Sequence, residues 1–490
     1  MHSPSRRLNC VWTLGVALTA CLAVAAQSAA FPTRTAAKPS ATASAGRLDA
    51  AFGRGGRTSA IMPHPERATL PYGRGRRSGS ATAISPSGDI AVARGRTVIE
   101  LSANGTLNPR FGHGGQLPLA LADELHFQLA SIVFDSRGRL LVAGTTWQSQ
   151  GMPGPQYFPG PPRAWATVWR FLPSGQPDRS FAVNGMLKTS FGLPAPVGRT
   201  YSGVDFGYEA PSILVSGIAV DAKNRPLITG AVVTKVASCY SGTRDLTSGY
   251  VVRLSLKGAP DPGFGINGIS LNPTVIEVEK PMIDRFSRVI YAGLINDQCG
   301  HGAVEETEVV ALKTNGQADQ SFGLEGRAQI AAFWSESSTV DSRGRILLLA
   351  HDTYFEGRRI HNLVLRLKPN GTTDPTFGHK GHASFRLPSN AEISALGVDG
   401  HGRPLLAGVA RRGLERPSRF LVMRLIEGGK VDRDFGRNGS VVTGFHRRAG
   451  AGANQILPDG RGRFLVSGIF NNPRYFFPAG VALARYSAGR

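Results

Sequence analysis

Cysteine is nearly absent from this sequence, with only four residues in 490. Two of them, Cys10 and Cys21, lie in the N-terminal apolar segment, so Cys239 and Cys299 are left for the rest of the chain. This count excludes a small disulfide-rich fold and a multi-cysteine zinc site. In an exported protein the remaining pair favours one disulfide between Cys239 and Cys299, with thiolate chemistry and metal binding as the alternatives.

Catalytic signatures are missing as well. No Gly-x-Ser-x-Gly, His-Glu-x-x-His or Walker-type glycine loop occurs, which removes the common sequence signs of serine hydrolases, zinc proteases and P-loop enzymes. The densest group of acid and base side chains is His301 with Glu305, Glu306 and Glu308. That grouping is more typical of a solvated loop than of a general acid/base pair. The sequence therefore predicts no catalytic residue, no metal site and no cofactor.

Acidic residues are few relative to basic ones, with 34 Asp and Glu against 56 Lys and Arg and a net charge of +22. Such an excess attracts polyanions. The arginines are spread along the chain, with no dense run beyond short pieces such as residues 74–77, so ordinary solvated surface charge is the alternative. We expect no specific recognition of nucleic acid.

Long apolar runs are absent except at the N-terminus. Arg6 and Arg7 precede an apolar stretch that is followed by small residues, which is the order of a secretory signal peptide. We therefore assign residues 1–30 to a signal peptide and residues 31–45 to a disordered linker. The expected location is the periplasm or the outside of the cell. The stretch Leu-Thr-Ala-Cys21 resembles a lipobox, so a lipoprotein anchored to the membrane at Cys21 is the alternative.

One short motif occurs seven times. Each copy contains a Phe, with Asp or Asn three residues before it and Gly four residues after it, as in VDRDFGRNG. The Phe residues are Phe52, Phe111, Phe181, Phe264, Phe322, Phe377 and Phe435. The residues three positions earlier are Asp49, Asn108, Asp178, Asp261, Asp319, Asp374 and Asp432. Fixed offsets in every copy indicate a structural repeat.

Two further markers lie between successive Phe motifs. One is a turn followed by apolar residues, as in DSRGRLLVAG at Asp135, with the weaker form SPSGDIAVAR at Ser85. The other is an apolar segment that ends in a Gly turn, as in VWRFLPSG. These signals predict four short strands in each unit, the first of which follows the Phe motif. Seven such units predict an all-β fold, a seven-bladed β-propeller of four-stranded antiparallel blades over residues 46–490.

The two chain ends support closure of a ring, because Ser-Ala-Gly-Arg occurs at residues 44–47 and again at 487–490. Together the markers resemble the delta-60 repeats of bacterial surface and secreted proteins, over residues 46–490. Asn108, Ala182 and the marker at Ser85 depart from that pattern. The resemblance implies export and a propeller-like fold, and it implies no activity or catalytic residues.

The repeated residues have structural explanations. An Asp or Asn before a tight turn caps backbone N–H groups, whereas calcium would need six to eight converging oxygens. The seven Phe residues are expected to be wedges between adjacent blades, and the repeated Gly residues are expected to have positive φ.

Loop length indicates where a partner could bind. Successive antiparallel strands place all the long, variable loops on one face of the ring, and loops on a rigid scaffold often carry binding residues. The candidate binding residues there are aromatic or basic: Trp147, Tyr157, Tyr240, Tyr354, Arg358, Arg359, Arg411, Arg412 and Tyr475. Packing of these loops onto themselves is the alternative.

The sequence as a whole favours a monomeric, non-catalytic binding protein whose partner is a polymer, such as an acidic polysaccharide, or another protein. A carbohydrate-active lyase or hydrolase that uses the same face is the second hypothesis, and a purely structural module at the cell surface is the third.

Overall fold

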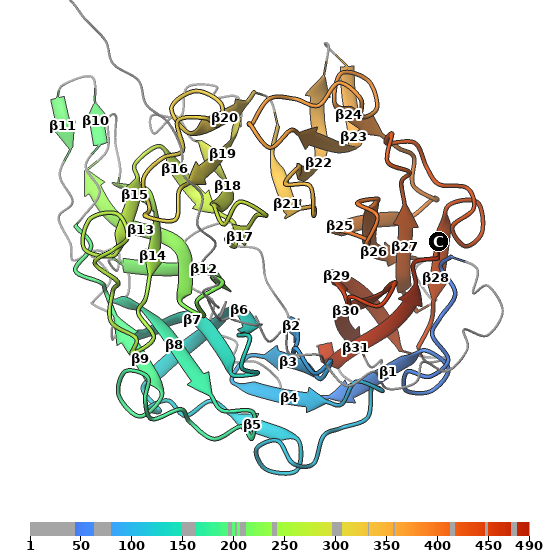
Figure 1. Cartoon of the computed structure of the whole chain (residues 1–490), viewed down its shortest axis with the longest axis horizontal. Coiled ribbons are helices and arrows are strands. Elements are labelled where there is room, and N and C mark those ends of the chain that lie inside the picture. Colours follow the sequence, from blue (N-terminus) through green and yellow to red (C-terminus); the bar gives the residue numbers. More distant parts are fainter. Residues whose placement is uncertain are drawn as a thin grey trace, which may run out of the picture. The chain divides into compact units, whose positions relative to one another are not determined.

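The computed structural model describes most of one compact unit, Ala43–Arg490. The described residues are 45–62, 80–148, 163–194, 198–200, 203–205, 212–237, 243–295, 306–331, 333–355, 358–411, 417–445, 449–471 and 478–489. Their strands form seven sheets arranged around a central axis and one separate two-stranded sheet (Figure 1). The predicted seven-bladed β-propeller is confirmed. No helix of the described residues has the length and apolar character needed to cross a bilayer.

Each blade is an antiparallel sheet whose successive strands lie progressively farther from the central axis (Figure 1). Blade 1 contains β2 (Ala81–Ile84), β3 (Ile90–Arg94), β4 (Thr97–Leu101) and β5 (Gln116–Pro118); blade 2 contains β6 (Leu125–Phe134), β7 (Leu140–Gln148), β8 (Ala164–Phe171) and β9 (Met186–Thr189). Blade 3 contains β12 (Ser212–Val220), β13 (Pro226–Ala237), β14 (Thr243–Arg253) and β15 (Ile269–Asn272). Blade 4 contains β16 (Val275–Val278) and β17 (Met282–Ile283), which both pair with β18 (Val289–Ile295), then β19 (Glu306–Leu312) and β20 (Arg327–Ile330).

The remaining blades complete the ring. Blade 5 contains β21 (Ser335–Val340), β22 (Ile346–Phe355), β23 (Arg358–Leu367) and β24 (His382–Ser384). Blade 6 contains β25 (Ala391–Val398), β26 (Pro404–Ala410), β27 (Arg419–Arg424) and β28 (Ser440–Thr443). Blade 7 contains β29 (Gly450–Pro458), β30 (Arg463–Asn471), β31 (Pro478–Ser487) and, as its outer strand, β1 (Arg57–Ile61). A separate hairpin joins β10 (Gly198–Thr200) to β11 (Gly203–Asp205).

The ring is closed by pairing between the two ends of the chain. Strand β1 is antiparallel to β31, with Thr58 opposite Leu483. The Gly turn after β31 is also shared between the ends, because the Ser487 amide donates to the Arg47 carbonyl at 2.8 Å and the Gly46 amide donates to the Ser487 carbonyl at 2.8 Å. In blade 2 the same turn is made by one continuous piece of chain, residues 172–176. The matching ends therefore complete a single turn, as closure requires.

The sequence repeat and the blade are out of phase by one strand. The strand after each Phe motif was predicted to be the first of its unit, but it is the outermost strand of the preceding blade, as β5 and β9 show in Figure 1. The reason is that the Phe motif makes the hairpin between the third and fourth strands of a blade. The cut between blades therefore falls after this strand, where the chain crosses to the next sheet.

Connections alternate between the two ends of the ring because successive strands are antiparallel. One end, the turn face, carries the connections between first and second strands and the Phe motifs between third and fourth strands. The other end, the variable face, carries the connections between second and third strands and those between blades. On the turn face the first connection has the same length in blades 2 and 5, residues 135–139 and 341–345. On the variable face the connection between the second and third strands differs in length: it consists of residues 95–96 in blade 1 and of residues 149–163 in blade 2.

The seven Phe side chains are fully buried, each with no exposed surface. Phe181, for example, lies in a cluster with Val168 of its own blade and with Ile213 and Val232 of the next. The residue after it, Ala182, donates its amide to the Lys257 carbonyl of blade 3 at 2.8 Å. The Phe motif therefore joins neighbouring blades by both packing and a backbone hydrogen bond.

Replacing Phe264 with Ala should lower the free energy of unfolding by about 3–5 kcal/mol, because the cavity cannot collapse around such a closely packed ring. A Cβ added to Gly316, which has a φ of +82°, would lie 2.9 Å from Cγ of Phe264. Denaturant unfolding would measure the loss. Phe286→Ala is the matched control, since Phe286 is 52% exposed and should change stability little. Equal effects of the two substitutions would contradict the wedge role.

Candidate functional site

Ion pairs lie beside the buried Phe residues at the junctions between blades. In blade 2 the Oδ2 atom of Asp178 accepts hydrogen bonds from Nε of Arg170 at 2.8 Å and from Nη1 of Arg139 at 3.3 Å. Its Oδ1 atom accepts from the Ser180 amide at 3.0 Å, which is the predicted turn cap. The guanidinium of Arg170 also stacks 4.5 Å from the centre of the Phe181 ring. One carboxylate thus caps a turn and neutralises two buried cations.

The electrostatics of this carboxylate follow from its partners. Burial alone would raise the pKa of Asp178, but the Ser180 hydrogen bonds and the charge of Arg170 together hold the pKa below its usual value. Asp178 is therefore ionised at neutral pH. Equivalent Arg–Asp pairs occur in blades 3, 5, 6 and 7 at Arg253–Asp261, Arg366–Asp374, Arg424–Asp432 and Arg485–Asp49.

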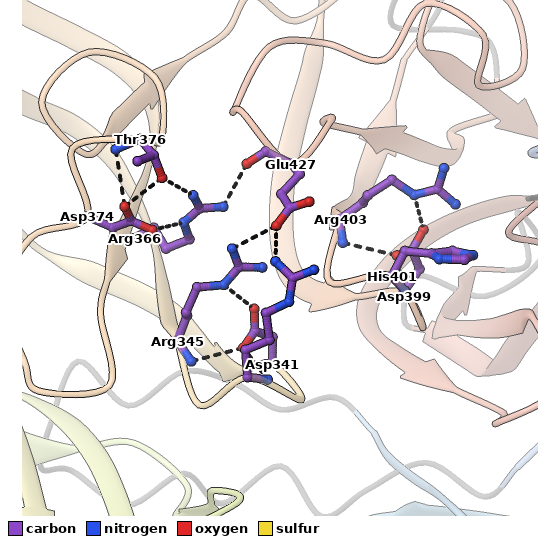
Figure 2. A network of polar contacts seen from close by, with 10 residues as sticks. Asp341, Arg345, Arg366, Asp374, Thr376, Asp399, His401, Arg403 and Glu427 are labelled. Atoms are coloured by element: carbon purple, nitrogen blue, oxygen red, sulfur yellow. Dashed lines mark hydrogen bonds and ion pairs between the residues drawn. The ribbon is translucent and has the colours of Figure 1, made fainter.

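Figure 2 shows how the network joins two blades. In blade 5, Nε of Arg366 donates to Oδ2 of Asp374 at 2.8 Å, and Nε of Arg345 donates to Oδ2 of Asp341 at 2.6 Å. Arg345 also donates from Nη1 to Oε1 of Glu427 at 3.0 Å. Glu427 follows β27 of blade 6, so this ion pair crosses the junction. We did not predict these arginines as functional or structural residues, although an Arg in an apolar segment such as VWRFLPSG was a visible signal.

Blade 1 has a different set of charges at these positions. Glu100 replaces the strand Arg, Asn108 replaces the Asp of the Phe motif, and Asp89 replaces the Arg of the turn. The Nδ2 atom of Asn108 donates to Oε1 of Glu100 at 2.7 Å. Glu100 is only 4% exposed, and burial raises its pKa to about 7, helped by Asp89 and opposed by the Asn108 hydrogen bond. This is a buried carboxyl group that has an amide in place of a cation as its partner.

Glu100→Gln should stabilise the protein at pH 8 and leave it nearly unchanged at pH 5. A carboxyl whose pKa is higher in the folded state favours folding while it is protonated, so its contribution to stability is lost as pH rises from about 4.5 to about 7. Thermal melts of both proteins at the two pH values measure the effect, and we expect the variant to gain about 1–3 kcal/mol at pH 8. A gain of equal size at both pH values would contradict the argument.

The variable face holds the predicted binding residues, and the structure places several of them in strands. Strands β22 and β23 extend through the predicted loop, so that Tyr354 is opposite Arg359 and Phe355 is opposite Arg358. Arg411 is half exposed, and its Nη1 atom donates to Oε1 of Glu392 at 2.8 Å. Tyr157, Tyr240, Arg412 and Tyr475 lie outside the described residues, as do Cys239 and Cys299.

Trp147 is misplaced in the predicted binding surface. It belongs to β7, is only 3% exposed and lies 5.4 Å, centre to centre, from the ring of His126. The error arose because β7 continues to Gln148, beyond the predicted start of the loop. A central strand of a blade is covered on both sides, so a residue near its end can still be buried.

The innermost strands form a second set of polar positions. The first strands of blades 2 to 7 each carry a register irregularity relative to the second strand, and bulges of this kind redirect side chains. In blade 4 the Glu279 carboxylate accepts hydrogen bonds from Oγ of Ser335 at 2.8 Å and of Ser338 at 2.5 Å. Glu279 therefore links the inner strands of blades 4 and 5.

Comparisons with known proteins agree with this architecture over one segment. Residues 344–377 match a family described as a domain of unknown function, DUF5122, beta-propeller. This segment runs from the end of a turn on the turn face to Phe377, the length of about one repeat. A search of curated proteins found no match.

Several solved structures are similar to the chain. A protein of unknown function from Bacteroides caccae has 10% identity, with 60% of this chain and 78% of that chain covered and a TM-score of 0.29. A eukaryotic initiation factor has 12% identity, coverage of 86% and 92%, and a TM-score of 0.34. The Dos1 propeller has 8% identity, coverage of 84% and 93%, and a TM-score of 0.36. These low identities and TM-scores give no information about function.

Proposed function

We propose that this protein is a non-catalytic β-propeller that binds a polymer or a protein partner through its variable face. The observation that supports this most is that the repeated structural contacts and the connections of variable length lie in different parts of the ring. The repeated ion pairs, Phe wedges and turn caps lie in the blade junctions and on the turn face. None of the repeated Arg–Asp pairs that the structure describes involves a connection of the variable face, so these connections can change without opening the ring.

The setting proposed for this function is outside the cytoplasm. The N-terminal residues 1–30 read as a signal peptide, and the repeat resembles the delta-60 repeats of bacterial surface and secreted proteins. A disulfide between Cys239 and Cys299 fits such an oxidising compartment. The exported protein would be either soluble or anchored to a membrane by a lipid on Cys21.

The acidic side chains that the structure describes near the blade junctions take part in contacts of the scaffold. Among the described residues, no group of three or more His, Cys, Asp or Glu side chains could hold a metal ion. The carboxylates that the structure brings together, such as Glu279 with Ser335 and Ser338, make contacts between blades. Glu308, which was predicted to lie with Glu305 and Glu306 in a solvated loop, instead belongs to β19 and is fully buried beside Arg327.

A glycan array probed with the mature protein would test this function, with acidic and neutral polysaccharides on the same array. We expect retention of a subset of ligands and loss of that retention in a Tyr354→Ala, Arg359→Ala double variant. Gln320→Ala, an exposed substitution on the turn face, is the matched control. Release of shortened products from a retained polysaccharide would instead identify an enzyme, and unchanged binding by the double variant would remove the β22–β23 hairpin from the site.

A further inference from the structure

Exposed basic residues recur on the turn face at equivalent positions. Two residues after the turn Asp, blades 2, 3 and 7 expose Arg137, Lys223 and Arg461. The turns of blades 2 and 3 touch each other, where the Ser136 amide donates to Oδ1 of Asn224 at 2.8 Å. Arg137 and Lys223 therefore belong to one continuous surface, and Arg461 is exposed at the equivalent position of blade 7.

More cations lie farther from the axis on the same face. Those in the Gly turns after the third strands include Arg47, Lys257, Lys313, Lys368 and Lys430, and those in the Phe motifs include Arg54, Arg110, Arg179, Lys380, Arg433 and Arg437, all exposed. Among the described residues, the exposed acids of the turn face are Glu325, Glu427 and Asp434, and Glu427 already pairs with Arg343. The turn face is therefore strongly positive.

The opposite face is close to balanced over the side chains whose exposure the structure describes, a set that does not include Arg358 and Arg359. Its exposed cations on the connections and strand ends are Arg163, Lys188, Arg386 and Arg411, and its exposed acids are Asp123, Glu124 and Glu392. The buried networks do not offset the excess either, because they contain nearly equal numbers of Asp and Arg. Among the side chains whose exposure the structure describes, the excess of positive charge thus lies mainly on the turn face.

Large apolar side chains project from the same positive face. Two residues after the Phe in blades 2, 3 and 4 stand Val183, Ile266 and Leu324, which are 75%, 81% and 81% exposed. Phe286, in the turn that follows the inner strand of blade 4, is 52% exposed. Within the described chain, these three aliphatic tips occupy one side of the ring. The same position holds Arg54 in blade 7 and Arg437 in blade 6.

We propose that the turn face docks on an anionic lipid bilayer. Cations alone would suit any polyanion, but exposed aliphatic tips gain free energy only when they enter an apolar phase. Anionic headgroups attract the Lys and Arg residues of a broad basic surface, and the tips of blades 2 to 4 then reach the acyl boundary. In this orientation the variable face points away from the membrane. The inference is independent of the proposed partner, which uses that opposite face.

Vesicle co-sedimentation of the mature protein tests this docking. We expect binding to vesicles that contain phosphatidylglycerol, little binding to pure phosphatidylcholine, and release at high salt. The triple variant Val183→Ser, Ile266→Ser, Leu324→Ser should bind at least about tenfold more weakly, since each tip loses apolar burial. Arg137→Glu with Lys223→Glu and Arg461→Glu should abolish binding. Arg163→Glu with Arg386→Glu, on the variable face, is the charge-reversal control and should bind as the parent does.

Thermal melts show whether each variant is folded. We expect all of them to fold, because the substituted side chains are exposed. Absence of binding to anionic vesicles by the parent protein would overturn the proposal. So would a soluble polyuronate that binds the parent and the apolar-tip variant equally while vesicles do not compete, because that result would assign the surface to a soluble polymer. Loss of vesicle binding in the variable-face control alone would assign the lipid contact to the variable face and would contradict the proposal.

Discussion

A chain that begins at residue 63 should fail to fold as a closed ring. Strand β1 would be missing, and it pairs with β31 along its full length, from Arg57 opposite Ala484 to Ile61 opposite Gly480. The deletion also removes Phe52 from the junction between blades 7 and 1, where it is fully buried. An unpaired strand at the edge of an incomplete ring is a site for aggregation.

The size of this effect comes from several losses at one junction. Asp49 accepts hydrogen bonds at its Oδ2 atom from Arg485 at 2.8 Å and from Arg463 at 2.9 Å. The deletion therefore leaves the buried Arg485 without its carboxylate and removes one of the two carboxylates of Arg463, which still pairs with Asp459 at 2.8 Å. Breaking a buried ion pair costs about 3–5 kcal/mol and removing a buried Phe costs a similar amount. Together these losses approach the total stability of a typical domain.

Size-exclusion chromatography and thermal unfolding would measure this outcome. We expect aggregation or the loss of a cooperative transition in the chain that begins at residue 63. A chain that begins at residue 44 keeps Phe52 and β1 and should melt as the mature protein does. A cooperative transition of unchanged midpoint in the shorter chain would show that closure through β1 does not stabilise the ring.

Asp178→Ala should lower the free energy of unfolding by about 3–5 kcal/mol. Arg170, whose side chain is only 1% exposed, and Arg139 share the Oδ2 atom of this carboxylate. The substitution therefore leaves Arg170 without its carboxylate partner and close to a second cation, Arg139, which still pairs with Asp135 at 2.6 Å. The turn also loses its cap, because the Ser180 amide donates to Oδ1 of the same residue. Denaturant unfolding at neutral pH would measure the change.

Asn108→Ala is the matched control for this substitution. Asn108 occupies the same place in blade 1, where it caps the turn through the Arg110 amide and donates to Glu100. Its removal breaks hydrogen bonds and leaves no buried cation unpaired, so we expect a smaller loss of about 1–2 kcal/mol. If the two substitutions destabilise the protein equally, the charge of Asp178 adds nothing beyond its turn cap.

The variable face shows where sequence reasoning reached its limit. The predicted start of the loop between β7 and β8 fell before Trp147, yet the strand continues to Gln148 and Trp147 is buried. Propensity and alternation do not mark this end, because pairing with β8 and coverage by neighbouring strands extend β7 beyond its local signal. Strands β22 and β23 likewise extend beyond their predicted ends, so Tyr354 and Arg359 lie in a β-hairpin and not in a loop.

The sequence alone was enough to determine the number of blades and the closed ring, because each unit is short, local in its turns and repeated at fixed offsets. Only the tertiary structure decided which charges meet. The hairpin after β8 brings Arg170 into contact with Asp178, and the packing of blades 5 and 6 brings Arg345 into contact with Glu427. It also decided that the exposed cations gather on the turn face, since residues far apart in the chain share a face only through the alternation of antiparallel strands. The spacing of residues along the chain is enough to detect the repeat, but the packing of adjacent sheets determines which side chains meet across a blade junction.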